Sequence, residues 1–315
     1  MNLTARAFVL GARLVPRLPG WLSAAVFRLV ADVCSLTGLG GVRQLERNLS
    51  RAAPWARGRR LRRLTRDGMR SYMRYYQEAL RLPAETPARL GQAVRVINDA
   101  HVREHLRGDR PVVMALGHSG NWDLAGAWSG QFLAPVLTVA ERLEPPEVFQ
   151  EFLELREHLG MTIVPLDSGG STFRSLLRLT GGRQIVPLLA DRDLSRQGVE
   201  VDLFGARARV AAGPATLALA TGAPLVAVRI SYERLRGARR QAAGRRWGLV
   251  VDFSDPIPVP EGRTTAESVE IMTQGWLDAL AQGIATQPQD WHMLQPVFVD
   301  DLDPDRLVDV PGARG

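Results

Sequence analysis

The sequence predicts an α/β fold: a mainly parallel central sheet flanked by helices, with a helical N-terminal region. Short apolar segments rich in β-branched residues recur along the chain and alternate with helical patterns. These segments are apolar throughout, which is typical of strands that are covered on both faces. The chain has 315 residues, 45% hydrophobic and 23% charged, which is enough for one large globular domain.

The predicted organisation is a single domain over residues 1–303, followed by a loose C-terminal tail at 304–315. Residues 1–82 form a basic helical region, and residues 83–303 form the α/β core. The net charge is +7, the chain contains no lysine, and residues 1–80 hold fifteen arginines against four acidic residues. This concentration of positive charge favours an anionic partner surface, either nucleic acid or a membrane.

The first predicted element is a helix from Leu22 to Leu36, with an amphipathic pattern that suits the plane of a membrane interface. A helix packed on the domain in the ordinary way is the alternative. Residues 5–41 are apolar but interrupted by arginines, prolines and glycines, so we expect neither a run of ~20 residues that spans a membrane nor a signal peptide. Cys34 is the sole cysteine, which excludes an internal disulfide and fits a reducing, cytoplasmic setting.

The remaining elements follow in order. From Val42 to Leu82 apolar residues recur at helical spacing, and Pro83 ends the pattern. Short apolar segments then predict strands at 94–98, 111–117, 134–140, 161–166, 184–190, 223–231 and 248–254. Between and after them, helices are predicted at 99–108, 121–130, 145–159, 171–180, 213–221 and 265–285.

Polar residues directly follow three of the predicted strands. His118 follows 111–117, Asp167 and Ser168 follow 161–166, and Asp191 and Arg192 follow 184–190. In open α/β sheets, ligands bind outside the carboxyl ends of the strands. We therefore expect these residues to share one rim and to form a site there.

His118 and Asp123 lie five residues apart in the segment GHSGNWDLAGAW. On a regular helix they would diverge by about 140°, so they can meet only if His118 lies in the turn before the helix. Gly117 and Gly120 permit such a turn. A carboxylate on one imidazole nitrogen fixes the tautomer and leaves the other nitrogen as a general base. A buried histidine satisfied by a neighbour is the alternative; with Asp191 the ligand set is thin for a metal, and none is expected.

The sequence offers no obvious covalent nucleophile. No G-x-S-x-G elbow is present, Cys34 lies in the basic N-terminal region, and Ser119 is adjacent to His118, where side chains rarely face each other. The histidine therefore suits direct activation of an acceptor hydroxyl, without a covalent acyl-enzyme. A thioester fits as the acyl donor because its thiol leaving group, with a pKa of about 8.5, needs little acid assistance.

The pattern His-x4-Asp after an apolar strand resembles the signature of glycerolipid acyltransferases. Further segments resemble the bacterial lipid A acyltransferase superfamily, and within it the actinobacterial branch of phosphatidylinositol mannoside acyltransferases: RQLERNLSRA, LTRDGMRSYMRYYQEALRLP, PLLADRDLSRQGVEVDLFG, RVAAGPATLALATGAPLVAV and QPQDWHMLQPVFVDDL. The resemblance covers about residues 10–303. It implies a glycerolipid-acyltransferase-like fold and a peripheral enzyme on the cytoplasmic face of the plasma membrane. Such an enzyme moves a long acyl chain, typically palmitoyl, from acyl-CoA to a mannose 6-hydroxyl of phosphatidylinositol mono- or dimannoside.

The resemblance also implies roles for individual residues. His118 matches the base, Asp123 its partner, and Asp191 an acidic position that is a glutamate in the mycobacterial enzymes. The predicted substrate-contacting residues are Arg156 and Arg192, which would meet phosphate, Asn121 and Trp122, which would shape the pocket, and Glu200. The alternatives are a solvated helix face for Arg156, packing in the core for Trp122 and an exposed strand position for Glu200. The N-terminal arginines, Arg59, Arg60, Arg62 and Arg63 among them, would hold the protein on anionic inner-membrane lipids. Acyl-CoA is a co-substrate, and no bound cofactor is expected.

Two other readings of the function stay open. The acceptor could be another glycolipid or a lysophospholipid, as in lipid A-type enzymes, because the catalytic motif does not specify it. The protein could also be a basic membrane- or nucleic-acid-binding protein without activity. Aromatic residues near the arginines are sparse apart from Tyr72, Tyr75 and Tyr76, which speaks against stacking on single strands, so no nucleic-acid partner is expected.

Overall fold

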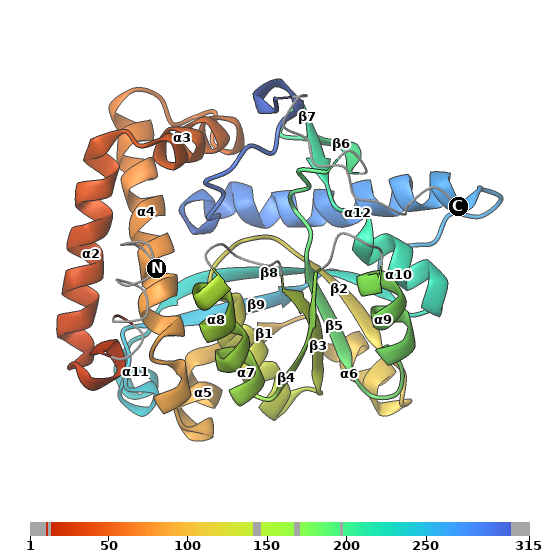
Figure 1. Cartoon of the computed structure of the whole chain (residues 1–315), viewed down its shortest axis with the longest axis horizontal. Coiled ribbons are helices and arrows are strands. Elements are labelled where there is room, and N and C mark those ends of the chain that lie inside the picture. Colours follow the sequence, from red (N-terminus) through yellow and green to blue (C-terminus); the bar gives the residue numbers. More distant parts are fainter. Residues whose placement is uncertain (1–10, 12–13, 141–145, 167–170, 196–197, 304–315) are drawn as a thin grey trace.

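The computed structural model describes residues 11, 14–140, 146–166, 171–195 and 198–303. Its centre is a seven-stranded sheet with strand order β1-β9-β8-β2-β5-β3-β4, with helices on both faces (Figure 1). Only the β8–β9 pair is antiparallel, so the prediction of a mainly parallel α/β sheet is confirmed. The strands are β1 Val94–Ile97, β2 Val112–Leu116, β3 Val136–Ala140, β4 Met161–Pro165, β5 Ile185–Leu189, β8 Leu225–Arg234 and β9 Trp247–Phe253.

A hydrophobic core lies on each face of this sheet. Strand β2 is buried along its whole length: Val113 and Ala115 pack into one core, and Met114 and Leu116 into the other. Helices α9, α10 and α12 cover the first core, and α5, α6 and α7 cover the second. The helices after residue 83 are α5 Pro87–Ala93, α6 Ala100–Arg107, α7 Trp122–Phe132, α8 Pro146–His158, α9 Ser171–Leu179, α10 Gly213–Thr221, α11 Gly237–Ala243 and α12 Thr265–Thr286.

One pair of strands was not predicted from the sequence. Strands β6 (Val199–Leu203) and β7 (Ala206–Val210) form a separate antiparallel hairpin. Its turn residues, Phe204 and Gly205, both have positive φ, as a two-residue hairpin requires. Phenylalanine is an unusual residue at such a position, so the usual Asn-Gly or Asp-Gly signal is missing.

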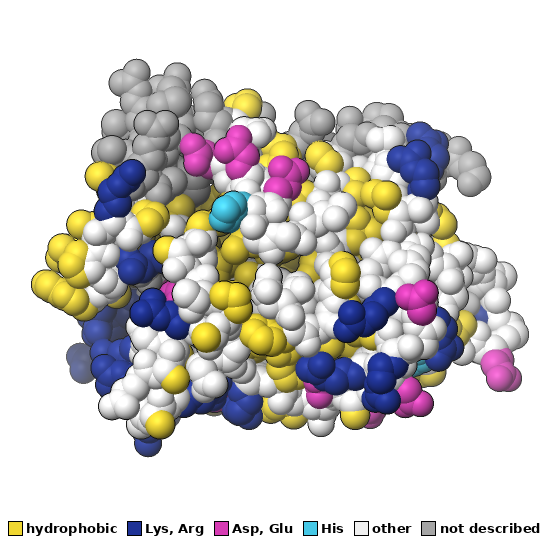
Figure 2. All heavy atoms as spheres, turned by 90° about the horizontal axis from the view of Figure 1, so that it is seen from below, with side chains coloured by type: hydrophobic (Ala, Val, Ile, Leu, Met, Phe, Trp, Pro, Cys, Tyr) yellow, Lys and Arg dark blue, Asp and Glu magenta, His cyan; other side chains and the backbone are white. Residues whose placement is uncertain are grey.

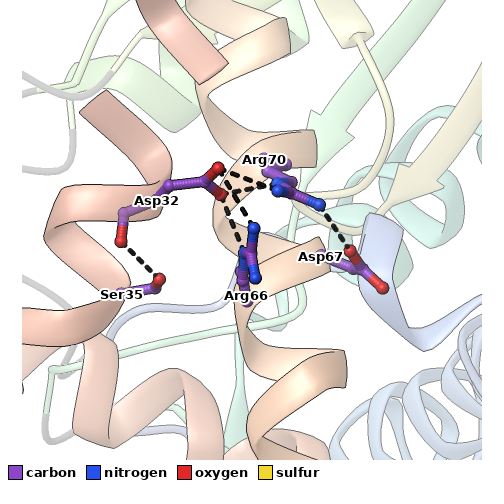
Figure 3. A network of polar contacts seen from close by, with 5 residues as sticks. All are labelled: Asp32, Ser35, Arg66, Asp67 and Arg70. Carbon is purple, nitrogen blue, oxygen red and sulfur yellow. Dashed lines mark hydrogen bonds and ion pairs between the residues drawn. The ribbon is translucent and has the colours of Figure 1, made fainter. Parts of the chain in front are cut away.

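The N-terminal region consists of η1 (Val15–Arg17) and three helices, α2 (Gly20–Thr37), α3 (Gly40–Ala52) and α4 (Arg59–Ala79). Helix α2 lies along α4 at one end of the molecule (Figure 1). Between them, Asp32 binds Arg70 at 2.6 Å and Arg66 at 3.0 Å (Figure 3). Hydrogen bonds and charge from the two guanidinium groups hold the pKa of Asp32 well below its usual value. The ion pairs fix α2 against the rest of the protein.

Most of the surface of α2 is nevertheless apolar and exposed. Trp21, Leu29 and Leu36 are 74%, 65% and 86% exposed. In Figure 2 apolar side chains gather at the edge of the molecule where Figure 1 places α2, with arginines beside them. By length and composition alone, α2 could cross a membrane. Arg28 and Asp32 lie within this 18-residue helix, so it does not contradict the prediction that residues 5–41 contain no uninterrupted apolar run of ~20 residues.

Parts of the sequence prediction are not tested by the structure. Asp167, Ser168 and the tail at 304–315 lie outside the described residues. The division into a region 1–82 and a core 83–303 stays a prediction.

Candidate active site

The site begins where the neighbouring parallel strands β2 and β5 end. Leu116 pairs with Leu189, and His118 and Asp191 each lie two residues beyond this last pair. The His118 Nδ1 lies 2.6 Å from Asp191 Oδ1, and the His118 backbone N–H donates to Asp191 Oδ2 at 2.9 Å. Strand register therefore places the imidazole beside the carboxylate.

Asp191 is fully buried and held on both oxygens. The indole N–H of Trp291 donates to Asp191 Oδ2 at 2.8 Å. Burial alone would raise the pKa of Asp191, but the charge and hydrogen bonds of His118, together with the Trp291 bond, outweigh it and lower the pKa below its usual value. The group stays an ionised acceptor, so the proton of a neutral imidazole sits on Nδ1 and the lone pair on Nε2.

The structure corrects the expectation that Asp123 orients His118. Asp123 is also buried, but its Oδ2 accepts from the Tyr75 hydroxyl at 2.7 Å and its Oδ1 from Arg156 Nε at 2.7 Å. Asp123 lies in the first turn of α7, and its side chain points to α4 and α8, which carry these two partners. The carboxylate next to the imidazole comes instead from β5.

The turn between β2 and α7 requires glycine at two positions. Gly120 has φ +61°, and a Cβ there would lie 2.7 Å from Ile230 Cγ2. A Cβ on Gly117 would lie 3.0 Å from Asp191 Oδ2. The glycines thus allow the chain to turn sharply and the carboxylate to approach the backbone at His118.

The two pocket residues of the motif have different surroundings. Asn121 is fully buried and caps α7: its Oδ1 accepts from Leu124 N–H at 2.9 Å, and its Nδ2 donates to Glu78 at 3.1 Å. Both ends of the amide are occupied, so it positions the helix and does not face a substrate. The Trp122 ring lies edge-on to His118, with centroids 5.6 Å apart, and stacks on Tyr75 at 4.1 Å.

The remaining predicted residues are spread over several elements. Arg156 binds Asp123, and the charge of that carboxylate raises the pKa of the guanidinium against the opposing effect of burial. Arg192 binds Gln295, and Glu200 pairs with Arg209 across the β6–β7 hairpin at 2.8 Å. The structure therefore does not bring Glu200 to His118, and the phosphate contacts of both arginines stay predictions. The four membrane-binding candidates, Arg59, Arg60, Arg62 and Arg63, are exposed in the first turns of α4.

A segment near the C-terminus, Asp290–His292, was missed as part of the site. The Asp290 carbonyl accepts from Gly120 N–H at 2.9 Å, and His292 N–H donates to the His118 carbonyl at 2.7 Å. Trp291 holds Asp191, as described above, and forms a β-bridge with Ser119. In the sequence this segment contributes only to the family resemblance. No short-range pattern links it to the turn at His118, because the two lie more than a hundred residues apart along the chain.

The arrangement is suited to general base catalysis. His118 is half-buried, its Nδ1 is used by a buried carboxylate, and its other nitrogen is left to take a proton. Within the described part of the chain, no group of three or more His, Cys, Asp or Glu side chains is arranged to hold a metal ion.

The chain is similar to known acyltransferases. The family model described as bacterial lipid A biosynthesis acyltransferase matches residues 4–299. A relative from Mycolicibacterium smegmatis, named phosphatidylinositol mannoside acyltransferase, is 40% identical over 307 residues, or 97% of this chain and 94% of the relative. Two relatives with the same name from strains of Mycobacterium tuberculosis are 38% identical over 270 residues, or 85% of this chain and 80% of each relative.

Proposed function

The chain belongs to the bacterial lipid A biosynthesis acyltransferase family, and from this premise we propose that it transfers a long acyl group, palmitoyl in the first instance, from acyl-CoA to a mannose 6-hydroxyl of phosphatidylinositol mono- or dimannoside. The names of its relatives support the acceptor. The observation that carries the chemistry is the His118–Asp191 pair, an imidazole with one nitrogen fixed by a buried carboxylate and the other free to act as base.

In the proposed reaction His118 Nε2 takes the proton from the acceptor hydroxyl as its oxygen attacks the thioester carbonyl. The tetrahedral intermediate collapses, the C–S bond breaks, and the coenzyme A thiolate leaves and takes up the proton. Asp191 stabilises the imidazolium that forms between these steps and keeps the ring in position. No acyl-enzyme forms. Asp123 and Arg156 act beside the base as a neutralised pair that holds α7 and α8 together.

We also infer that the protein works at the cytoplasmic face of the plasma membrane as a peripheral enzyme. The exposed apolar side of α2 suits the interfacial region of a bilayer, and the exposed arginines of α4 suit anionic headgroups. Acyl-CoA, the proposed donor, is a cytoplasmic thioester. The ion pairs of Asp32 support an α2 that lies on the membrane, because a spanning helix would have to separate from Arg66 and Arg70.

The test is a reaction of the purified protein with palmitoyl-CoA and a panel of acceptors, read by mass spectrometry. The panel holds phosphatidylinositol mono- and dimannoside, a lipid A precursor, lysophospholipids and vesicles without acceptor. We expect mannoside acylation by the wild type and loss of turnover in His118→Ala, with the fold and acyl-CoA binding largely intact. If only another lipid of the panel is acylated, that lipid is the acceptor and the proposed mannoside acceptor is wrong. Wild-type turnover in His118→Ala would overturn the mechanism, and binding to anionic vesicles and RNA alike without turnover would favour a protein that merely binds charge.

A further inference from the structure

A narrow cavity runs under α7, along the sheet, and starts next to the base. It encloses about 50 Å³. Its polar end lies at Trp122, Asp123 and Arg156, and the Trp122 ring is the one that contacts His118. Its other end lies at Val136 and Met161, the first residues of β3 and β4, which pair in register. Because these strands are parallel to β2 and β5, the cavity leads from the catalytic edge of the sheet towards the opposite edge.

At the far end of the cavity, the side chain of Met161 lies against Gly126 of α7. Met161 is buried, and a Cβ on Gly126 would lie 2.7 Å from its Cε and 3.0 Å from its Sδ. Glycine inside a helix costs about 1 kcal/mol relative to alanine. Because glycine has no Cβ, Gly126 leaves room for the thioether of Met161 at the end of the cavity. Gly130, one turn further along α7, has only one atom near a built Cβ, at 3.9 Å.

The size of the cavity indicates which part of its wall must respond to a ligand. Ligand pockets usually measure about 300–1,000 Å³, so a long acyl chain cannot enter about 50 Å³ unless side chains move. The apolar walls include Val136 at the far end, which is β-branched, and Pro187 in the middle of β5, whose ring is rigid. Met161 is the adaptable member, with three rotatable side-chain bonds.

We propose that Met161, seated against Gly126, sets the length of acyl chain that the site accepts. The inference rests on the proposed acyl transfer and names the residue that determines donor specificity within it. A chain whose methyl end stops short of Met161 leaves the thioether in place. A longer chain has to displace it from its contact with Gly126 and loses binding energy in doing so.

The experiment measures kcat/KM for saturated acyl-CoAs of increasing length with one fixed glycolipid acceptor. Met161→Ala opens the far end and shifts the preference to longer chains. Gly126→Ala drives the thioether into the cavity and shifts the preference to shorter chains. We expect each substitution to change the ratio of kcat/KM between acyl-CoAs of neighbouring chain lengths by about tenfold or more. In the double variant, the effect of Gly126→Ala disappears because the side chain that it displaces is gone.

Matched controls separate this role from general damage to the core. Met272→Ala removes a buried methionine on the other face of the sheet, and Gly130→Ala adds a methyl group to the same helix without a close contact. Neither should change chain-length preference. Should Met161→Ala fail to fold, Met161→Val shortens the side chain while keeping a good strand residue and gives the same direction.

The outcomes distinguish the two levels of the inference. A wild type that transfers no acyl chain from any donor would overturn the proposed function, and the inference with it. A wild type that is active, with variants whose length profile matches the controls, would overturn the role of Met161 alone. Persistence of the Gly126→Ala effect in the Met161→Ala background would also overturn it, because the added methyl group itself would then be the obstacle.

Discussion

At the residue scale, the two carboxylates near the base have different partners and so different roles. Asp191 is held by three donors: the ring and backbone nitrogens of His118 and the indole of Trp291. Asp123 is held by Tyr75 and Arg156. Asp191 controls the tautomer of the base, and Asp123 connects its own helix α7 to helices α4 and α8.

This difference predicts opposite outcomes for two matched substitutions. An asparagine at Asp191 has one oxygen for three donors, and an amide N–H facing Nδ1 would move the imidazole proton to Nε2. We expect Asp191→Asn to lower kcat by about 10²- to 10⁴-fold with little change in acyl-CoA affinity. Asp123→Asn leaves the His118–Asp191 pair intact and should mainly lower the melting temperature. Steady-state kinetics and thermal unfolding decide, and wild-type kcat in Asp191→Asn would contradict the assignment.

How far the sequence predicts the site depends on which contacts are local. The edge of the sheet, the turn at Gly117 and Gly120 and the base itself follow from apolar segments and the residues after them. The partner of His118 does not follow from spacing along the chain, because Asp123 is near in sequence but turns away. The register between β2 and β5 identifies Asp191 as the partner, since His118 and Asp191 each lie two residues beyond the last pair of these adjacent strands. Trp291 could not be found this way, because it reaches the site from a loop after α12.

At the element scale, the residues at the N-terminal end of α4 destabilise this helix. It begins with arginines at 59, 60, 62 and 63, with no side-chain cap and no acidic residue in its first turn. Positive charges at a helix N-terminus oppose the helix dipole, each by about 0.3–1 kcal/mol. An anionic membrane surface, as proposed above, would compensate these charges.

Replacement of these four arginines by glutamine tests that explanation. We expect binding to anionic vesicles to fall by up to about a thousandfold, since each basic group contributes about 1 kcal/mol, while the melting temperature holds or rises. The control replaces Arg107, Arg110, Arg174 and Arg178, which are exposed on α6 and α9 and in the loop between α6 and β2. Equal binding of both variants in a vesicle sedimentation assay would show that net charge alone matters.

At the scale of the whole molecule, buried polar contacts join the N-terminal helices, the catalytic turn and the C-terminal segment. Ser71 of α4 donates to Asp290 at 2.7 Å, and the His292 Nε2 lies 3.0 Å from the same hydroxyl. Glu78 of α4 accepts from Asn121 and from Tyr232. A change at the junction of these parts should therefore be felt in the stability of the entire fold.

His292 makes that junction sensitive to acid. Burial, followed by the charge of Arg74, lowers the pKa of its imidazole to about 3, whereas an unfolded histidine titrates near 6.5. Between these values the unfolded chain binds a proton that the folded protein excludes, so the free energy of unfolding falls as pH falls. Glutamine can keep the bond to Ser71 but does not titrate. We expect His292→Gln to reduce the slope of stability against pH, from about pH 6.5 to about pH 4.5, by up to about 1.4 kcal/mol per unit.

Denaturant unfolding at a series of pH values measures this slope, and His158→Gln, which removes an exposed histidine at the end of α8, controls for the loss of an imidazole. The same slope in wild type and His292→Gln would mean that the buried ring takes up its proton without loss of the fold. A reduced slope would identify His292 as the point where acid separates α4 from the catalytic turn. Turnover should then fall in the same pH range, because the backbone N–H of His292 also holds the carbonyl of His118.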